Sequence, residues 1–157
     1  MSLQLDLALK LVKEAEGFSS KKYLCPAGRV TQGFGRNLEA HPLSDEELTE
    51  LNGDGTVSET VAEKWALHEL LDCEIKLMSN IIYKNQSPIR KAVLLDMCFN
   101  VGYTGLMKFK KMWFALGNNN YAEAAREMKD SKWYVDVGTR AKRNVTIMAS
   151  NTIVPKE

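Results

Sequence analysis

The sequence is poor in the side chains that bind transition metals or form disulfides. It contains 2 histidines and 3 cysteines in 157 residues. The segment that begins at His68-Glu69 lacks the second histidine of the H-E-x-x-H motif, which argues against a zinc protease. Cys25, Cys73 and Cys98 are an odd number at long spacings, and this pattern predicts unpaired thiols rather than a disulfide framework. We therefore expect neither a metal nor another cofactor.

Long apolar runs are also absent. The longest strongly apolar stretch after residue 11, residues 92–101, is interrupted by Asp96 and Asn100 and is far shorter than the ~20 residues that a membrane-spanning helix requires. Residues 1–11 carry Asp6 and Lys10, and they lack the basic start and the small-residue cleavage site of a secretory signal. We expect no export signal and no stable membrane insertion.

The formal net charge is only +1, which argues against a dedicated nucleic-acid binder, so no nucleic-acid partner is expected. This small value is a cancellation. Residues 1–83 carry 8 basic and 14 acidic side chains, whereas residues 84–157 carry 13 and 6. A basic second half indicates an anionic partner for part of the surface. The alternative is that the charged helix faces are merely solvated, and both interpretations stay open.

Hydrophobic periodicity predicts an α+β chain that is mostly helical with one small sheet. Apolar residues recur at helical spacing over residues 3–16, and again from a cap at Thr56 or Ser58 to about residue 82. Ser87-Pro88 is an N-cap followed by proline, and it opens a helix whose middle is apolar almost all round. Glycine-punctuated alternation predicts a hairpin or small sheet over residues 23–34. Ser44 caps a short acidic helix, and shorter helices are expected near residues 106–116, 121–130 and 139–149.

These elements predict one domain with two lobes. The sheet-bearing lobe covers about residues 17–57, and a connecting helix follows over about residues 58–82. The helical lobe covers about residues 83–157 and includes the N-terminal helix 3–16. At this length a chain buries roughly 68–70% of the surface that its unfolded form exposes, so it needs no disulfide or structural metal to hold a core.

Glu16 is unusual among the charged residues of the first predicted helix. It continues the row of Ala8 and Val12 on the apolar face, whereas Glu14 lies on the polar face. A carboxyl at the end of an apolar stripe is expected to be partly desolvated, which raises its pKa towards a value useful for a general acid. The alternative is an ordinary helix-end glutamate that swings into water.

Three short segments resemble a known signature. Glu16-Gly17, then Tyr23-Leu24-Cys25, then Thr31-Gln32-Gly33-Phe34-Gly35 resemble the pattern glutamate, x8, aspartate or cysteine, x5, threonine of the phage-type lysozymes, glycoside hydrolase family 24. The likeness continues over nearly the whole chain, in Met97–Gly105, Ser131-Lys132-Trp133-Tyr134 and Arg140-Ala141-Lys142-Arg143. The resemblance implies a lysozyme-like α+β fold with a cleft between two lobes.

The same resemblance assigns roles to individual residues. Glu16 takes the general-acid position, and Arg140 is the matching residue for the arginine that holds this glutamate in the family. Thr31 falls on the threonine that positions water near the sugar. Gly33 and Gly35 beside it would let the sheet backbone approach the substrate closely. For Arg140 a surface charge on a basic helix, and for Thr31 a plain strand residue, are the structural alternatives.

Cys25 stands where the aspartate version of the signature has a second carboxylate. A neutral thiol has a pKa of ~8.5 and provides no negative charge at pH 7. A thiolate favoured by Lys21, Lys22 or Arg29 could stabilise positive charge or act as a base or nucleophile. A buried, inert cysteine is the alternative.

The sugar-contacting positions of the family fall on Asn37, Phe99, Met112 and Glu127. Phe99 and Met112 are equally compatible with core packing. The resemblance implies a monomer that binds bacterial peptidoglycan and hydrolyses the β-1,4 bond between N-acetylmuramic acid and N-acetylglucosamine. It would stay in the host cytoplasm until release to the cell wall and would then cause lysis. Two alternatives remain, namely cleavage by a single glutamate without water, as in lytic transglycosylases, and a silent glycan-binding domain.

Overall fold

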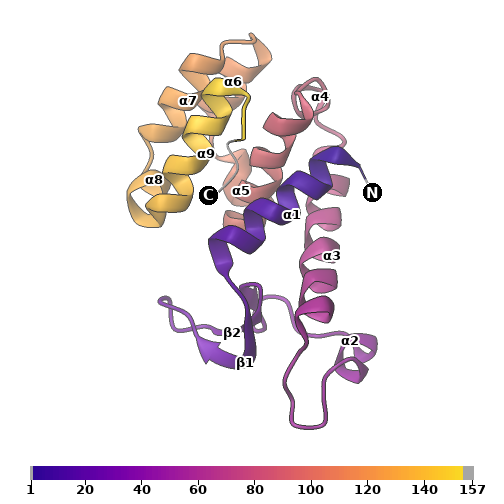
Figure 1. Ribbon diagram of the computed structural model, residues 1–157. Helices are drawn as coiled ribbons and strands as arrows, with labels where there is room; N and C mark the ends of the chain where they lie inside the picture. The colour runs from indigo at the N-terminus through magenta and orange to yellow at the C-terminus, as the bar shows by residue number, and fades with distance from the viewer. Residues whose placement is uncertain (1, 154–157) are drawn as a thin grey trace. The chain divides into compact units, whose positions relative to one another are not determined.

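Helices dominate the described part of the chain, residues 2–153 of a computed structural model (Figure 1). The residues divide into two compact units. Unit 1 comprises the described residues up to Ala8 and from Leu70 onward, and unit 2 comprises Leu9–Glu69. Helices α1 (Leu3–Glu16) and α3 (Glu59–Leu77) each contribute residues to both units. The predicted α+β class, mostly helical with a small sheet, is confirmed.

Unit 2 contains a three-stranded antiparallel sheet in the order β1 (Ser19–Leu24), β2 (Val30–Gly33) and β3 (Arg36–Asn37). The turn between β1 and β2 is closed by the Cys25 N–H, which donates to the Arg29 carbonyl at 2.9 Å, and by the Gly28 N–H, which donates to the Cys25 carbonyl at 2.8 Å. Gly28 has a φ of +78°, a conformation that glycine adopts without steric cost. The predicted hairpin around Pro26-Ala27-Gly28 is therefore confirmed.

The buried Arg36 anchors the outer strand β3 to the rest of unit 2. Its guanidinium donates to both carboxylate oxygens of Glu47 and to the carbonyl oxygens of His41 and Pro42. Glu47 belongs to α2 (Asp45–Thr49), whose N-cap is the predicted Ser44 in a reciprocal capping box. Burial opposes ionisation of Glu47, but hydrogen bonds from Arg36 and Ser44 hold its pKa below the ordinary value. These bonds tie β3 to α2 and to the loop between them.

In unit 1, α5 (Pro88–Met107) begins as the sequence predicts, with Ser87 accepting from the Arg90 N–H and proline in the first turn. The side chains from Ala92 to Cys98 are all buried. Gly102 interrupts the helix with a φ of 80° and a ψ of 163°. The remaining helices of this unit are α4 (Ile81–Lys84), α6 (Lys110–Gly117), α7 (Tyr121–Lys129), α8 (Lys132–Val137) and α9 (Thr139–Ser150). Helix α7 packs against both α6 and α9 (Figure 1).

Two helix boundaries differ from the predicted ones. The helix expected over residues 58–82 ends at Leu77, because Asn80 caps a separate short helix, α4, by accepting from the Ile82 and Tyr83 N–H groups. Ser58 caps α3, with its hydroxyl accepting from the Val61 N–H at 3.2 Å. The helix expected from residue 106 begins at Lys110, since α5 continues to Met107. Among residues 2–153, no helix is both long and apolar enough to cross a membrane.

Candidate active site

Glu16 is the last residue of α1, and its side chain is half-buried. The helix ends there because Gly17 takes a φ of +67°, with its N–H still donating to the Lys13 carbonyl at 3.0 Å. A glycine in this conformation is a common helix terminator. The carboxyl is therefore presented at a fixed point where the helix gives way to β1.

Gly35 lies directly against the Glu16 carboxyl. A Cβ atom at Gly35 would be 2.2 Å from Glu16 Oε2 and 2.4 Å from Glu16 Cδ, which is closer than van der Waals contact allows. The φ of Gly35 is +69°, which also favours glycine. Gly35 immediately precedes Arg36, whose ion pair with Glu47 fixes the local backbone. The missing side chain at Gly35 is thus the space that the Glu16 carboxyl occupies.

Both glycines also make close contacts within the protein. The Cβ direction of Gly33 points at Ala62, 3.1 Å away, and that of Gly35 points at Glu16. The close approach of the sheet backbone to substrate stays a prediction. No local pattern predicts the contact between Glu16 and Gly35, because Glu16 ends α1 whereas Gly35 lies in the turn between β2 and β3.

Gly35→Ala is expected to lower cell-wall cleavage about 10²-fold, because misplacing a reacting group by about 1 Å has an effect of that size. Backbone strain at a positive φ adds a stability cost of about 1–3 kcal/mol. Gly55→Ala is the matched control, since Gly55 has a φ of +83° and open space around its Cβ direction. Rates of wall clearing and urea unfolding curves measure both effects. Equal losses of activity in the two variants would contradict a positioning role for Gly35.

Thr31, Tyr23 and Cys25 lie together on the β1–β2 hairpin. Thr31 is buried in β2 and pairs with Tyr23 in the antiparallel register. Its hydroxyl donates to the Arg29 carbonyl at 2.9 Å. Burial raises the pKa of Tyr23, and the negative charges of Glu16 and Cys25 raise it further. Glu16, Tyr23 and Cys25 are therefore close enough to interact electrostatically.

The Cys25 thiol is half-buried, and its pKa lies below the ordinary thiol value. The main cause is a hydrogen bond from the Arg29 backbone N–H, with smaller contributions from the Ala27 backbone and the Thr31 side chain, while burial acts in the opposite direction. The expected cause was the charge of neighbouring lysine or arginine side chains. Hydrogen bonds from the hairpin backbone lower the pKa of Cys25 instead. The Arg29 guanidinium lies 3.7 Å from a carboxylate oxygen of Glu39. The three cysteines of the chain form no disulfide.

Asn37 joins this group through the sheet. It lies on β3 and pairs with Thr31 in the antiparallel register. Its side-chain oxygen accepts from the N–H groups of Glu39 and Ala40, both at 3.0 Å. The side chain thus closes a turn, and its amide nitrogen is the part that could contact a sugar. Unit 2 therefore brings together Glu16, Cys25, Thr31 and Asn37 of the predicted site residues.

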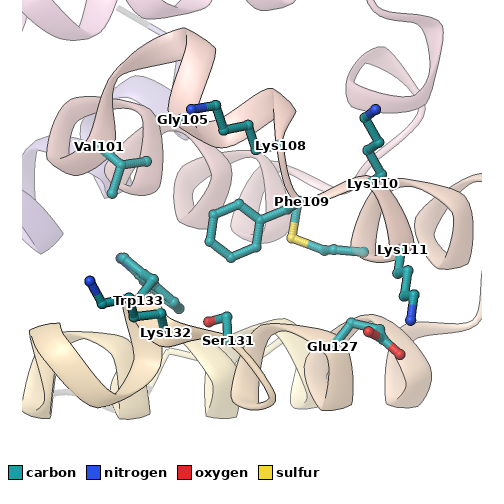
Figure 2. Close-up of a pocket in the computed structure, with 11 residues that line it drawn as sticks. Val101, Gly105, Lys108, Phe109, Lys110, Lys111, Glu127, Ser131, Lys132 and Trp133 are labelled. Atoms are coloured by element: carbon teal, nitrogen blue, oxygen red, sulfur yellow. The ribbon is translucent and has the colours of Figure 1, made fainter.

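The other predicted site residues belong to unit 1. Phe99 is half-buried on α5, and Glu127 is half-buried on α7. Met112 on α6 is fully buried, which supports the packing interpretation of this residue. Met112 and Glu127 nevertheless line one pocket, the one shown in Figure 2. The sugar-contacting roles of all three residues stay predictions.

Arg140 forms part of a buried charge cluster around Asp96, a side chain with no exposed surface. The Arg140 Nε and Nη2 atoms donate to the two carboxylate oxygens of Asp96, at 3.0 and 2.8 Å. Arg143 and Asn144 donate to Asp96 Oδ2 at 3.0 and 2.8 Å. The Arg140 side chain is only 9% exposed, so it is not a surface charge. Its predicted role beside Glu16 stays a prediction.

Asp96 was missed as an important residue, although the sequence contained a signal. It is the one charged residue in the apolar stretch 92–99, and a charge inside a buried helix must be paired. The donors follow each other in the pattern Arg140-x-x-Arg143-Asn144. Within residues 2–153, no group of three or more His, Cys, Asp or Glu side chains is placed to hold a metal ion.

A small antiparallel sheet, a majority of helical residues and a glutamate at the end of the first helix are consistent with a lysozyme-like α+β fold. The family model described as Phage lysozyme matches residues 13–146, and the chain belongs to this family. The family supports assignment as a lysozyme-like peptidoglycan hydrolase.

Similar curated proteins come from an amoeba and from a phage. The chain is 25% identical over 159 aligned residues to a probable T4-type lysozyme 2 of Dictyostelium discoideum, with 91% of this chain and 94% of that protein covered. A probable T4-type lysozyme 1 from the same organism is 33% identical over 72 residues, covering 46% of this chain and 42% of that protein. The pre-baseplate central spike protein Gp5 of Enterobacteria phage T4 is 24% identical over 159 residues, covering 92% of this chain and 28% of that protein.

Proposed function

We propose that this member of the phage lysozyme family hydrolyses the β-1,4 bond between N-acetylmuramic acid and N-acetylglucosamine in bacterial peptidoglycan, and that it acts in cell lysis. The observation that carries the proposal is the Glu16 carboxyl, held in the space at Gly35 and in the same unit as Cys25 and Thr31. The signature spacing of these three residues and the family membership support the same reaction.

Glu16 acts as the general acid in this proposal. It donates its proton to the glycosidic oxygen while the bond from that oxygen to the sugar C1 breaks, and positive charge develops on the sugar ring. The carboxyl lies in the space that the glycine at position 35 leaves open, and in this proposal that placement aligns the proton with the leaving oxygen. The two electrons of the broken bond stay on the leaving oxygen, which becomes a hydroxyl group.

In this proposal Thr31 orients and Cys25 deprotonates the water molecule that completes the reaction. The Thr31 hydroxyl lies close enough to the Cys25 sulfur to affect the pKa of the thiol, although its proton is donated to the Arg29 carbonyl, so the two side chains are neighbours. Thr31 orients the water, and the Cys25 thiolate accepts one of its protons as the remaining hydroxide adds to C1. The Cys25 thiolate thus acts as the general base, a role that a second carboxylate has in most inverting glycosidases.

Product analysis by mass spectrometry tests the reaction class. Hydrolysis adds one water for each bond cleaved, so fragments reducible by borohydride at N-acetylmuramic acid are expected. Cleavage without water would leave a 1,6-anhydro end, and that outcome would favour the transglycosylase alternative, which the replacement of a carboxylate by Cys25 motivates. Binding to purified walls without any cleavage product would favour the other alternative, a glycan-binding domain without catalytic activity.

The Cys25 thiolate also has a measurable pH signature. Because its pKa is lowered, alkylation by iodoacetamide is expected to reach half of its maximal rate at a lower pH than alkylation of an ordinary thiol. Activity should fall in step with alkylation, and Cys25→Ser should lower kcat more than it lowers stability. Cys73→Ser is the control that should keep full activity and full sensitivity to the reagent. Unchanged activity in Cys25→Ser and after alkylation would reduce Cys25 to a packing role.

A further inference from the structure

An open pocket of about 560 Å³ lies within unit 1, where the end of α5, the start of α6 and the residues from α7 into α8 meet (Figure 2). Its floor is aromatic. The rings of Phe109 and Trp133 pack edge to face, with centroids 5.7 Å apart. The Trp133 indole N–H already donates to Asn100 Oδ1 at 2.9 Å, so the indole offers the pocket an apolar surface only.

The rim of this pocket is basic. Lys108, Lys110, Lys111 and Lys132 are among its lining residues, and Figure 2 shows Lys108 and Lys132 near the Phe109 and Trp133 rings and Lys110 and Lys111 on the far side of Phe109 from Trp133. All four lysine side chains are exposed. Lys132 lies 3.7 Å from Asp136, whereas the ammonium groups of the other three make no ion pair with any residue of the described range 2–153.

The balance of charge at the rim is strongly positive. Glu127 is the sole acidic residue among those that line the pocket. Four lysines and one glutamate line the same hollow, so an anion that enters it is attracted by the net positive charge. A purely inorganic anion would leave the aromatic floor unused, and a neutral sugar would leave the charge unused.

We propose that this pocket binds a small anionic amphiphile, with an apolar chain or ring on the Phe109–Trp133 floor and a phosphate, sulfonate or carboxylate group between the rim lysines. Burying the apolar part removes its surface and that of the two rings from water, and the lysines act as point charges for the acid group. Pockets with a mainly apolar lining and a few convergent polar groups are typical ligand sites.

This site is separate in chemistry from the proposed glycosidase reaction. Met112 and Glu127 also line the pocket and fall on predicted sugar-contacting positions, but the proposal rests on the four lysines and the two rings. The binding test below contains no cell wall, so its failure would leave the proposed reaction untouched. Failure of the wall-cleavage test would equally leave the pocket untouched.

Octyl phosphate, used as a monomer below its micelle concentration, is the test ligand, with calorimetry and the NMR signal of the Trp133 indole N–H as readouts. Octanol and inorganic phosphate each carry half of its chemistry and are expected to bind at least about tenfold more weakly. Binding should weaken with added salt, because exposed charges are screened. Equal affinity for octanol, salt-independent binding, or an unshifted Trp133 signal would overturn the proposal.

A charge-matched pair of triple variants locates the site. Lys108→Gln, Lys110→Gln and Lys111→Gln together should weaken octyl phosphate binding about tenfold, since each exposed charge contributes modestly. The control removes three other exposed lysines of the same unit, in Lys84→Gln, Lys129→Gln and Lys142→Gln, and should bind like the unmodified protein. Equal weakening in both variants would mean that net charge and not the pocket attracts the ligand, which would overturn the proposal. Binding to phosphatidylglycerol vesicles without binding of monomeric octyl phosphate would overturn it as well.

Discussion

Glu16→Gln is expected to lower the rate of cell-wall clearing about 10²–10⁴-fold, the range that a positioned general acid contributes. Glutamine keeps the size and shape of the side chain but has no acidic proton to donate. Because Glu16 is half-buried at the helix end and glutamine fits the same space against Gly35, the fold should persist. The measurement is the loss of turbidity of a purified wall suspension, with circular dichroism as the check on folding.

Glu14→Gln is the matched control for this experiment. Glu14 lies in the same last turn of α1, is exposed, and differs from Glu16 by facing away from the apolar stripe. It loses the same charge at nearly the same distance from the helix end, so any effect of charge on substrate attraction is shared by both variants. Retention of wild-type clearing by Glu16→Gln, or a similar loss in Glu14→Gln, would remove Glu16 from the acid role.

Asp96→Ala should cost about 3–5 kcal/mol of unfolding free energy, because it leaves buried charges without their partner. Asp96 has no exposed surface and accepts four hydrogen bonds from Arg140, Arg143 and Asn144. Removing the carboxylate therefore costs much more than removing a surface ion pair. Urea unfolding with unchanged m-values measures the difference directly.

The exposed ion pair between Lys132 and Asp136 provides a comparison for the loss of unfolding free energy at Asp96. Asp136 lies 3.7 Å from Lys132 in a pair whose side chains are largely exposed, and Asp136→Ala should cost about 0–1 kcal/mol. Asp96→Asn should fall between the two, because asparagine keeps one acceptor oxygen but turns an amide donor towards the arginines. This milder variant keeps the comparison measurable if Asp96→Ala fails to fold. A cost for Asp96→Ala as small as that of Asp136→Ala would show that the cluster contributes little to stability.

Local signals in the sequence were sufficient for most of the secondary structure. The caps at Ser44, Ser58 and Ser87 each mark a helix start in the structure, and Gly17 marks the end of α1. These signals are readable because a cap satisfies backbone groups within three residues of itself. The break between α3 and α4 was missed because Asn80 lies inside a continuous apolar pattern. Helix α8 was missed because six residues are too short for a period to appear.

The candidate site was predictable only as a set of residue types at signature spacing. The contact of Gly35 with Glu16 and the packing of Arg140 on Asp96 join elements that are far apart in sequence, and no local pattern encodes them. The same holds for the lysine-rimmed pocket. Lys108, Lys110 and Lys111 precede or open α6, whereas Lys132 opens α8, and only the packing of both helices against α7 brings these residues to one hollow.

Gly102 has a consequence for how α5 opens and closes. Its dihedral angles lie in a region restricted essentially to glycine, so the helical hydrogen-bond ladder stops and restarts there. Unfolding that begins at the helix end near Met107 is therefore expected to stop at Gly102. The residues before Gly102 can stay helical. We expect amide hydrogen exchange to divide the helix into two cooperative segments, of which the buried run from Ala92 to Cys98 exchanges more slowly. The F-N-x-G segment thus acts as a joint between a rigid core helix and a more easily opened extension.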